Sequence, residues 1–128
     1  MNIPEELKYT KDHEWLKIEG DVCTIGITDF AQDHLTDVVF VELPEVGDRA
    51  EAGKTIATVE SVKAVSDVFS PVTGEVVGVN EALPDEPEKV NEDPYGDGWM
   101  VKIKMENPAE TEALLNAEEY EKHCESGD

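Results

Sequence analysis

Short runs in which apolar and polar residues alternate recur along most of this 128-residue chain, and turn residues separate them. Alternation with a period of two is typical of β-strands that bury one face. Such strands are predicted at residues 15–18 and 23–27, Val38–Leu43, Thr55–Val62, Val65–Ser70, Glu75–Asn80 and Trp99–Met105. The pattern therefore predicts a mostly β fold with few and short helices.

Two of the turns between these runs share one pattern, in which a glycine follows a proline by three residues and an acid comes next. The first turn is Pro44–Asp48 and the second is Pro71–Glu75. Proline and glycine at such spacings are typical of turns. The repetition favours two related β halves that flank a central hairpin.

The starts of three short helices are predicted from side chains that can accept hydrogen bonds from the first turn. They are Thr28, followed by Asp29 in a run that extends to Leu35; Asn107, followed by Pro108; and Asn116, with Glu119 as the other half of a capping box. The last two place a C-terminal helical segment at about residues 108–124, and the acidic, proline-rich segment 81–97 is predicted as a surface excursion or short helix. No linker interrupts the pattern, so residues 1–128 are predicted to form a single domain.

Acidic residues dominate the charge of the chain. Ten Lys and Arg against 31 Asp and Glu give a formal net charge of −21. Such a surface repels phosphate backbones and anionic lipids, so we expect no nucleic-acid partner and no membrane partner. No apolar run approaches the ~18 residues of a membrane span, and the N-terminus resembles neither a secretory signal nor a transit peptide. The expected location is the cytoplasm, or the mitochondrial matrix if a transit peptide has been removed.

The sequence offers little chemistry of its own. Cys23 and Cys124 form no C-x-x-C pair, and Cys23, in an apolar stretch, is predicted to be a small core residue. We find no nucleophile motif, no metal-ligand spacing and no phosphate-binding glycine loop. An enzyme is therefore not expected, nor is a metal.

Lys63 stands between two β-prone runs that meet without glycine or proline. If a hairpin turns at Val62–Ala64, the side chain of Lys63 projects from its tip, where a modifying enzyme can reach the amine. Acylation there would remove the positive charge. Periodicity alone favours the simpler interpretation of an ordinary surface lysine.

The run Glu60-Ser61-Val62-Lys63-Ala64 resembles the lipoyl-attachment hairpin of the glycine cleavage system H protein family. The resemblance continues in order from about Lys8 to Tyr120, through residues 8–10, 13–15, 26–32, 41–47, 66–76 and 90–99. Biotin carriers are less similar, because they usually place methionines on both sides of the lysine. Lipoyl domains of 2-oxoacid dehydrogenases, which typically have Asp-Lys-Ala and are shorter, are also less similar.

This resemblance implies a barrel-sandwich hybrid fold with lipoate in amide linkage to Lys63, added by a lipoate-attaching enzyme. It implies a monomeric, non-catalytic carrier that takes an aminomethyl group from a pyridoxal-phosphate glycine decarboxylase to a tetrahydrofolate-dependent aminomethyltransferase. Dihydrolipoamide dehydrogenase would then reoxidise it. Two alternatives stay open: a carrier that supplies lipoate to other lipoyl-dependent enzymes, and an unmodified acidic scaffold.

In the family the loaded arm folds into a surface cleft, and the resemblance places Glu14, His34 and Asp67 there. Each residue also has a simpler interpretation. Glu14 would be a solvated strand carboxylate, His34 a partly buried histidine, and Asp67 a charge that keeps the hairpin soluble. We expect His13 to be structural and His123 to be exposed on the last helix.

The chain departs from the family pattern at Thr36, where the family commonly has glycine after a short helix. If the backbone is left-handed at this position, a β-branched residue is strained there. The departure therefore puts the local end of the helix in doubt and has no bearing on Lys63.

Overall fold

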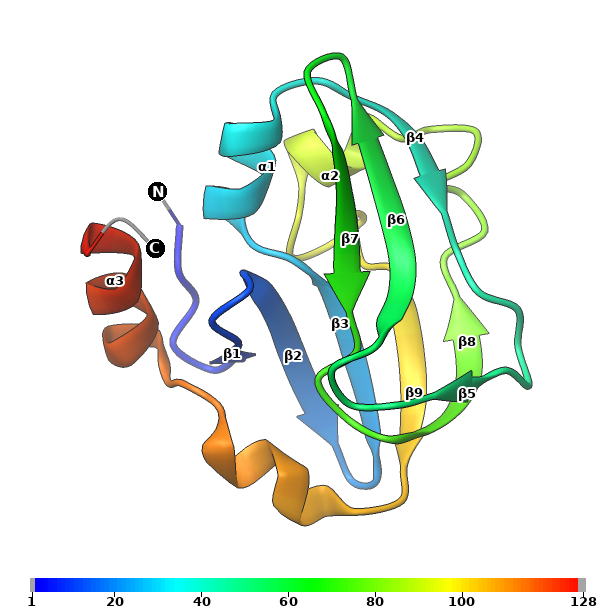
Figure 1. Cartoon of the computed structure of the whole chain (residues 1–128), viewed down its shortest axis with the longest axis vertical. Coiled ribbons are helices and arrows are strands. Elements are labelled where there is room, and N and C mark those ends of the chain that lie inside the picture. The colour runs from blue at the N-terminus through cyan, green and yellow to red at the C-terminus, as the bar shows by residue number, and fades with distance from the viewer. Residues whose placement is uncertain (1, 127–128) are drawn as a thin grey trace.

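The fold, seen in a computed structural model that describes residues 2–126, consists of two antiparallel sheets surrounded by short helices (Figure 1). The strands are β1 (Lys8–Tyr9), β2 (Glu14–Glu19), β3 (Val22–Ile27), β4 (Val38–Glu42), β5 (Arg49–Ala50), β6 (Thr55–Ser61), β7 (Val65–Phe69), β8 (Gly74–Val79) and β9 (Val101–Met105). The larger sheet has the order β1-β2-β3-β9-β8-β5, and the smaller has the order β4-β6-β7.

All the predicted strands are present, and the mostly β class is confirmed. The two-residue strands β1 and β5 were not predicted, because two residues are too few to show alternation. The last strand begins at Val101 and not at the predicted Trp99, although the N–H of Met100 already donates to the carbonyl of Ile25 at 2.8 Å.

The helices are α1 (Asp29–Leu35), α2 (Lys89–Glu92), the 3₁₀ helix η1 (Pro108–Ala113) and α3 (Ala117–Glu125). Two predicted caps are confirmed: Thr28 accepts a hydrogen bond from Ala31, and Asn116 forms a capping box with Glu119. The Asn107 side chain makes no capping bond. Among residues 2–126, no helix has the length and apolar character needed to cross a membrane.

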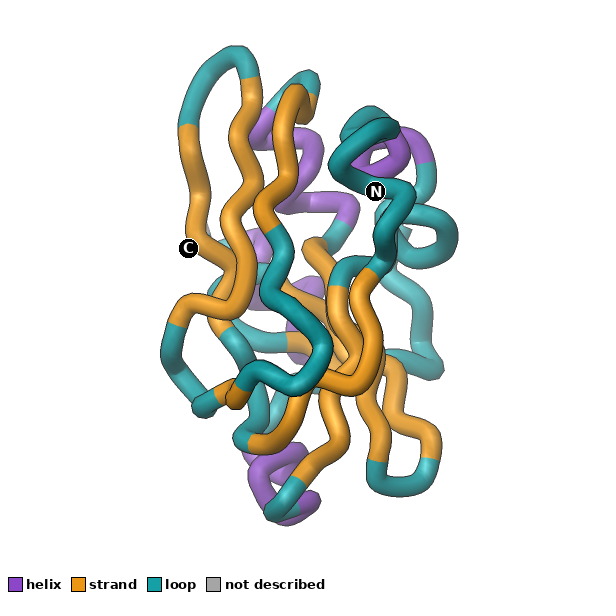
Figure 2. The backbone as a smooth tube through the Cα atoms, turned by 90° about the vertical axis from the view of Figure 1, so that its right-hand side faces the viewer, coloured by secondary structure: helices purple, strands orange, loops and turns teal. Residues whose placement is uncertain are grey.

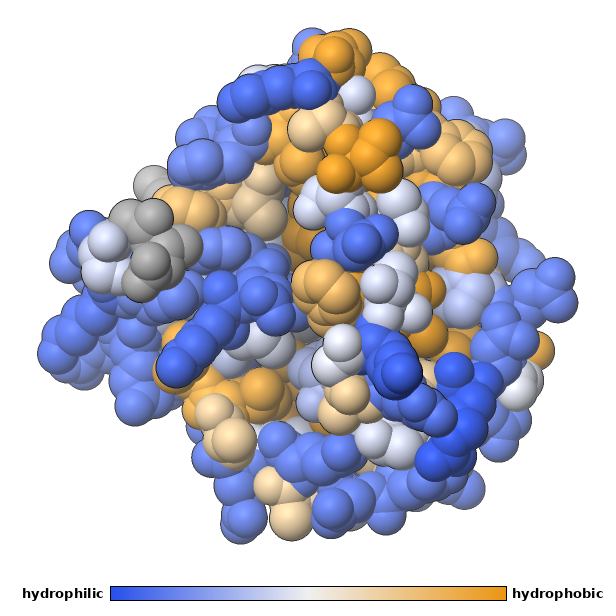
Figure 3. All heavy atoms as spheres, in the orientation of Figure 1, coloured by the Kyte–Doolittle hydropathy of each residue, from blue (hydrophilic) through white to orange (hydrophobic). Residues whose placement is uncertain are grey.

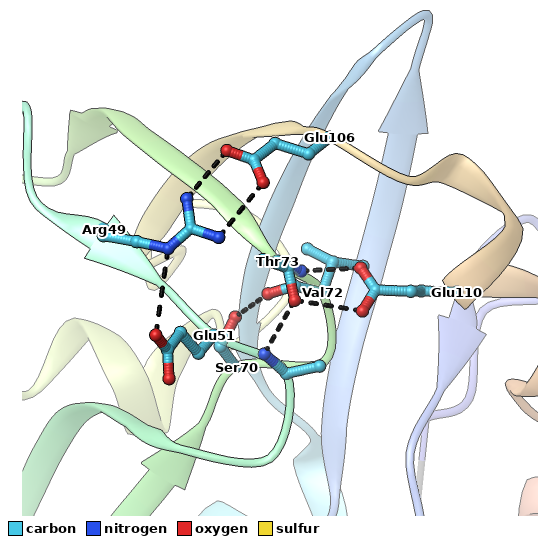
Figure 4. Close-up of polar contacts among 8 residues, drawn as sticks. Arg49, Glu51, Ser70, Val72, Thr73, Glu106 and Glu110 are labelled. Atoms are coloured by element: carbon cyan, nitrogen blue, oxygen red, sulfur yellow. Dashed lines mark hydrogen bonds and ion pairs between the residues drawn. The ribbon is translucent and has the colours of Figure 1, made fainter.

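Side-chain bonds hold η1 and β5 at the end of the molecule opposite the β6–β7 turn (Figure 4). The carboxylate of Glu110 accepts from the N–H and the hydroxyl of Thr73 at 2.7 and 3.0 Å. Arg49 donates to both oxygens of Glu106, at 2.8 and 3.1 Å. A glutamate inside η1 therefore anchors this segment in place of the predicted cap at Asn107.

The main core lies between the two sheets. Leu16, Ile25 and Ile103 of the larger sheet and Val41 and Val59 of the smaller one are at most 1% exposed. Burial of these side chains supplies most of the driving force for folding. Cys23 belongs to the same core, as predicted, and burial raises the pKa of its thiol to about 12.

A second apolar cluster packs α3 against β1 and β2. Tyr9, Trp15 and Tyr120 are almost completely buried in it, and the rings of Tyr9 and Tyr120 stack at 4.7 Å. Trp15 on β2 pairs with Gly26 on β3, and a Cβ atom at Gly26 would come within 2.8 Å of the indole nitrogen. The cluster thereby fixes the beginning of β2 and the C-terminal helix relative to each other.

Thr36 ends α1 with φ 64° and ψ −147°, so the positive φ on which the expectation of strain depended is present. This conformation lies close to a region that only glycine occupies readily. Asn91 holds the segment in place, because its side chain donates to the carbonyl of Thr36 at 2.7 Å and accepts from the N–H of Val38 at 2.9 Å.

Thr36→Gly is therefore expected to raise the free energy of unfolding by about 1 kcal/mol. Relief of strain of about 1–3 kcal/mol exceeds the roughly 0.5–1 kcal/mol that glycine costs through the entropy of the unfolded chain. Urea denaturation measures the change. Thr55→Gly, at an exposed strand position of negative φ, is the control and should lower stability; a less stable Thr36→Gly protein would contradict the assignment of strain.

Candidate functional site

The hairpin formed by β6 and β7 extends beyond the rest of the molecule (Figure 2). Its turn is Val62–Ala64, as predicted, and Lys63 occupies the middle of it. All three turn residues are exposed, whereas Ser61 is 7% exposed. The amine of Lys63 is thus on the surface at the tip of a two-stranded projection.

The side chain of Ser61 closes the turn from inside. Its hydroxyl oxygen accepts from the N–H groups of Lys63 and Ala64 at 3.2 and 3.0 Å and donates to the carbonyl of Ala64 at 3.1 Å. The N–H of Ser61 donates to the same carbonyl at 2.8 Å. The motif residues Ser61 and Ala64 therefore hold the backbone of Lys63, while its side chain extends away from the turn.

The side chain of Lys63 lies toward α1. Its ammonium group donates to the carbonyl of His34, in the last turn of that helix, at 3.3 Å. The C-terminal end of a helix carries partial negative charge and favours a cation. The contact directs the side chain toward the surface on which the other candidate residues lie.

A cleft of about 330 Å³ opens between α1, the start of β2 and the β6–β7 hairpin (Figure 3). Glu14, His34 and Asp67 all line it, so three residues far apart in the sequence share one cavity. The remaining walls are mainly apolar: Ile27, Phe30, Ala31, Leu35, Val59 and Val68. An apolar cavity with a few polar groups suits a ligand that is mostly apolar with a polar end.

Glu14 is only 2% exposed, so it is no solvated strand carboxylate. One carboxylate oxygen accepts from the hydroxyl of Thr10 at 2.6 Å, and the other accepts from the N–H of Phe69 at 3.1 Å. Burial raises the pKa of Glu14 to about 7, and the nearby Asp12 carboxylate adds to this rise, while the two hydrogen bonds oppose it. The cleft therefore contains a buried carboxyl group that changes charge near neutral pH.

His34 and Asp67 differ from Glu14 in being exposed. The ring of His34 stacks on Phe30 at 4.2 Å, and its Nδ1 lies 2.9 Å from the carbonyl of Phe30. The interpretation of His34 as a partly buried histidine is therefore wrong. Asp67 lies on β7 opposite Thr58. Both residues are at the open side of the cleft.

His13 packs against Tyr120 and Phe30, in keeping with a structural role. It also lines the cleft, a position that was not predicted from the sequence. Its Nδ1 lies 2.7 Å from the hydroxyl oxygen of Tyr120, and its ring stacks on Phe30 at 4.5 Å. The one signal in the sequence was its position directly before Glu14. His123 is half-buried and not exposed as predicted, because its Nε2 bonds the carbonyl of Lys11 at 2.9 Å.

Sequence comparison connects these features to one family. The family model described as glycine cleavage H-protein matches residues 7–127. The glycine cleavage system H protein of Magnetococcus marinus is 61% identical over 120 residues, which are 94% of this chain and 86% of the relative. That of Carboxydothermus hydrogenoformans is 54% identical over 123 residues, 96% of this chain and 95% of the relative.

The fold agrees with the sequence comparison. The crystal structure of a glycine cleavage system H protein from Mycobacterium marinum superimposes with a TM-score of 0.87 at 41% identity, covering 98% of this chain and all of the other. The predicted fold class, a barrel-sandwich hybrid with short helices, is thereby confirmed. Since nearly its whole length matches in sequence and in fold, the chain belongs to the glycine cleavage H-protein family, the carrier component of the glycine cleavage system.

Proposed function

We propose that this chain carries lipoate on Lys63 and moves an aminomethyl group from glycine decarboxylase to the tetrahydrofolate-dependent aminomethyltransferase. Dihydrolipoamide dehydrogenase then restores the oxidised carrier, and a separate enzyme attaches the lipoate. The observation that carries the proposal is an exposed lysine amine at the tip of a projecting hairpin, beside a mainly apolar cleft of about 330 Å³.

The residues present fit a lipoyl group. An exposed amine at a projecting turn is accessible to a modifying enzyme, and the amide that replaces it no longer carries a charge. The apolar walls of the cleft, among them Phe30, Leu35 and Val68, suit a hydrocarbon arm. When bound, lipoate would supply a disulfide whose cleavage provides a sulfur atom for the aminomethyl cargo, and thiol–disulfide exchange would later restore the disulfide.

The cleft residues have distinct roles in this proposal. Glu14, which is 2% exposed, pairs with the positively charged amine of the cargo, and such pairing favours the ionised form of the Glu14 carboxyl group. The apolar walls keep water away from the cargo and slow its loss by hydrolysis. Asp67 and His34, at the open side, bind the polar part of the arm.

The charge of the chain supports transient contact with several partner enzymes. A net charge of −21 is expected to speed encounter with basic docking surfaces, because complementary charge acts mainly on the association rate. Raising the salt concentration should therefore reduce the rate of transfer between partners at limiting carrier concentration.

Intact-mass analysis of protein from lipoylating cells, followed by peptide mapping, tests the attachment. A single added lipoyl mass on Lys63 is expected. Reconstitution with the three partner enzymes tests the cycle, and glycine-dependent ammonia release is expected only with the modified protein. Protein that stays unmodified would overturn the proposal, as would modified protein that supports no ammonia release.

A further inference from the structure

Tyr120, on the C-terminal helix α3, is completely buried, and its hydroxyl group lies between two other segments of the chain. Its oxygen is 2.6 Å from the Oγ1 of Thr28 and 2.7 Å from the Nδ1 of His13. Thr28 and His13 are in turn joined through the backbone, since the N–H of Thr28 donates to the carbonyl of His13 at 3.1 Å. One hydroxyl thus bonds both segments at the point where they meet.

These two segments lead directly into opposite walls of the cleft. Thr28 caps α1, which contributes Phe30 and His34 to one wall. His13 is followed by Glu14, the buried carboxyl of the other wall. Tyr120 itself does not line the cleft, so any influence that it has on Glu14 must pass through the position of these segments.

The segment that bears His13 needs such support. His13 has φ 70° in the turn between β1 and β2, a backbone conformation that is uncommon for residues other than glycine. Contacts with the surrounding structure offset the cost of such a conformation. Here the hydroxyl of Tyr120 and the ring of Phe30, stacked at 4.5 Å, hold the histidine side chain.

We propose that Tyr120 is a positioning residue for the cleft: through its hydroxyl group, α3 holds the β1–β2 turn against the start of α1 and keeps Glu14 out of water. The role of the cleft in holding a loaded arm rests on the proposed function above. The positioning itself is a property of the unmodified chain and can be measured without the cofactor.

The titration of Glu14 distinguishes positioning from a purely structural contribution. Apart from burial, the groups that shift its pKa are the hydroxyl of Thr10, the N–H of Phe69 and the carboxylate of Asp12. His13, His34 and Asp67 also face the cleft. Since Tyr120 belongs to neither set, replacing it can alter the pKa of Glu14 only indirectly, by moving these groups, by changing the hydrogen bonding of His13 or by admitting water.

The experiment compares Tyr120→Phe with Tyr9→Phe in unlipoylated protein, with the Glu14 carboxyl followed by carbon NMR through a pH titration. Tyr9 stacks on Tyr120 and is equally buried, but its hydroxyl bonds the carbonyl of Pro4, away from the cleft. Tyr120→Phe should lower the midpoint by about one pH unit, a tenfold change in the dissociation constant. Tyr9→Phe should leave it unchanged, and an unchanged midpoint in Tyr120→Phe would overturn the proposal.

Thr28 supplies a second pair of variants in case Tyr120→Phe does not fold. Thr28→Ser keeps the hydroxyl group and should keep the wild-type midpoint. The isosteric Thr28→Val loses both the contact with Tyr120 and the cap on Ala31, and it should lower the midpoint at least as far as Tyr120→Phe does. In lipoylated protein, Tyr120→Phe should also release its cargo about tenfold faster. If the Glu14 midpoint shifts while the release rate does not, positioning stands and the proposed role of the cleft fails. If lipoate is never attached, the proposed function fails, but the titration of unmodified protein still tests whether Tyr120 positions the cleft.

Discussion

Lys63→Arg is expected to abolish lipoate attachment and all glycine-dependent turnover without altering the fold. Arginine keeps the positive charge and can still donate to the carbonyl of His34, which Lys63 contacts at 3.3 Å. Its guanidinium group, however, stays protonated and does not form the amide. Intact mass should show no lipoyl addition, and ammonia release in the reconstituted system should fall to background.

Stability should hardly change in this variant, because an exposed residue of a turn makes little packing contact. The free energy of unfolding is expected to stay within about 0.5 kcal/mol of the wild-type value. Lys17→Arg, at an exposed position on β2, is the control and should be modified and active as the wild type is. Lipoylation that persists in Lys63→Arg would place the attachment site elsewhere.

Glu14→Gln is expected to remove a large pH dependence from the stability of the protein. Burial raises the pKa of Glu14 to about 7 from its ordinary value of 4.5, so the folded state holds a proton that the unfolded state releases between these values. The free energy of unfolding therefore keeps its full value with respect to this group below pH 4.5 and falls as the pH rises through 7. Glutamine keeps the shape of the side chain and stays neutral throughout.

The stability of Glu14→Gln relative to the wild type should therefore increase by about 3 kcal/mol between acidic and mildly alkaline pH. Urea denaturation at a series of pH values measures this difference, with Glu19→Gln, exposed on the same strand, as the control. The same variant should release the proposed aminomethyl cargo faster, because a neutral amide forms no ion pair with an ammonium group. Parallel stability curves for Glu14→Gln and wild type would contradict the raised pKa.

The sequence predicted much of the fold because its signals are local. Alternation located the long strands, and the side chains of Thr28 and Asn116 marked two helix starts that the structure confirms. The family pattern, in which glycine commonly stands where this chain has Thr36, pointed to an unusual backbone at the end of α1, and the structure gives φ 64° there. At Asn107 the same reasoning failed, because Glu110 bonds Thr73, a partner 37 residues away in sequence, and anchors η1 from within.

The candidate site depends on contacts between distant segments, which local patterns do not reveal. Nothing in the run around Glu14 shows that the carboxylate is buried, and one of its two hydrogen bonds comes from Phe69, 55 residues later. Likewise, the side chain of His13 contacts the hydroxyl group of Tyr120, 107 residues away. Family resemblance placed Glu14, His34 and Asp67 in one cleft, and the structure brings the three together, but their different exposures required the three-dimensional fold.

The closed turn around Ser61 has a consequence for any group attached to Lys63. Since hydrogen bonds to Ser61 hold the backbone of the turn, an attached arm pivots about a fixed point and can sweep only the volume its own bonds allow. Its return to the cleft is then an intramolecular event, with an effective concentration of the order of millimolar. Even a weak intrinsic affinity would keep the arm sheltered for much of the time, yet let it leave quickly when an enzyme competes for it.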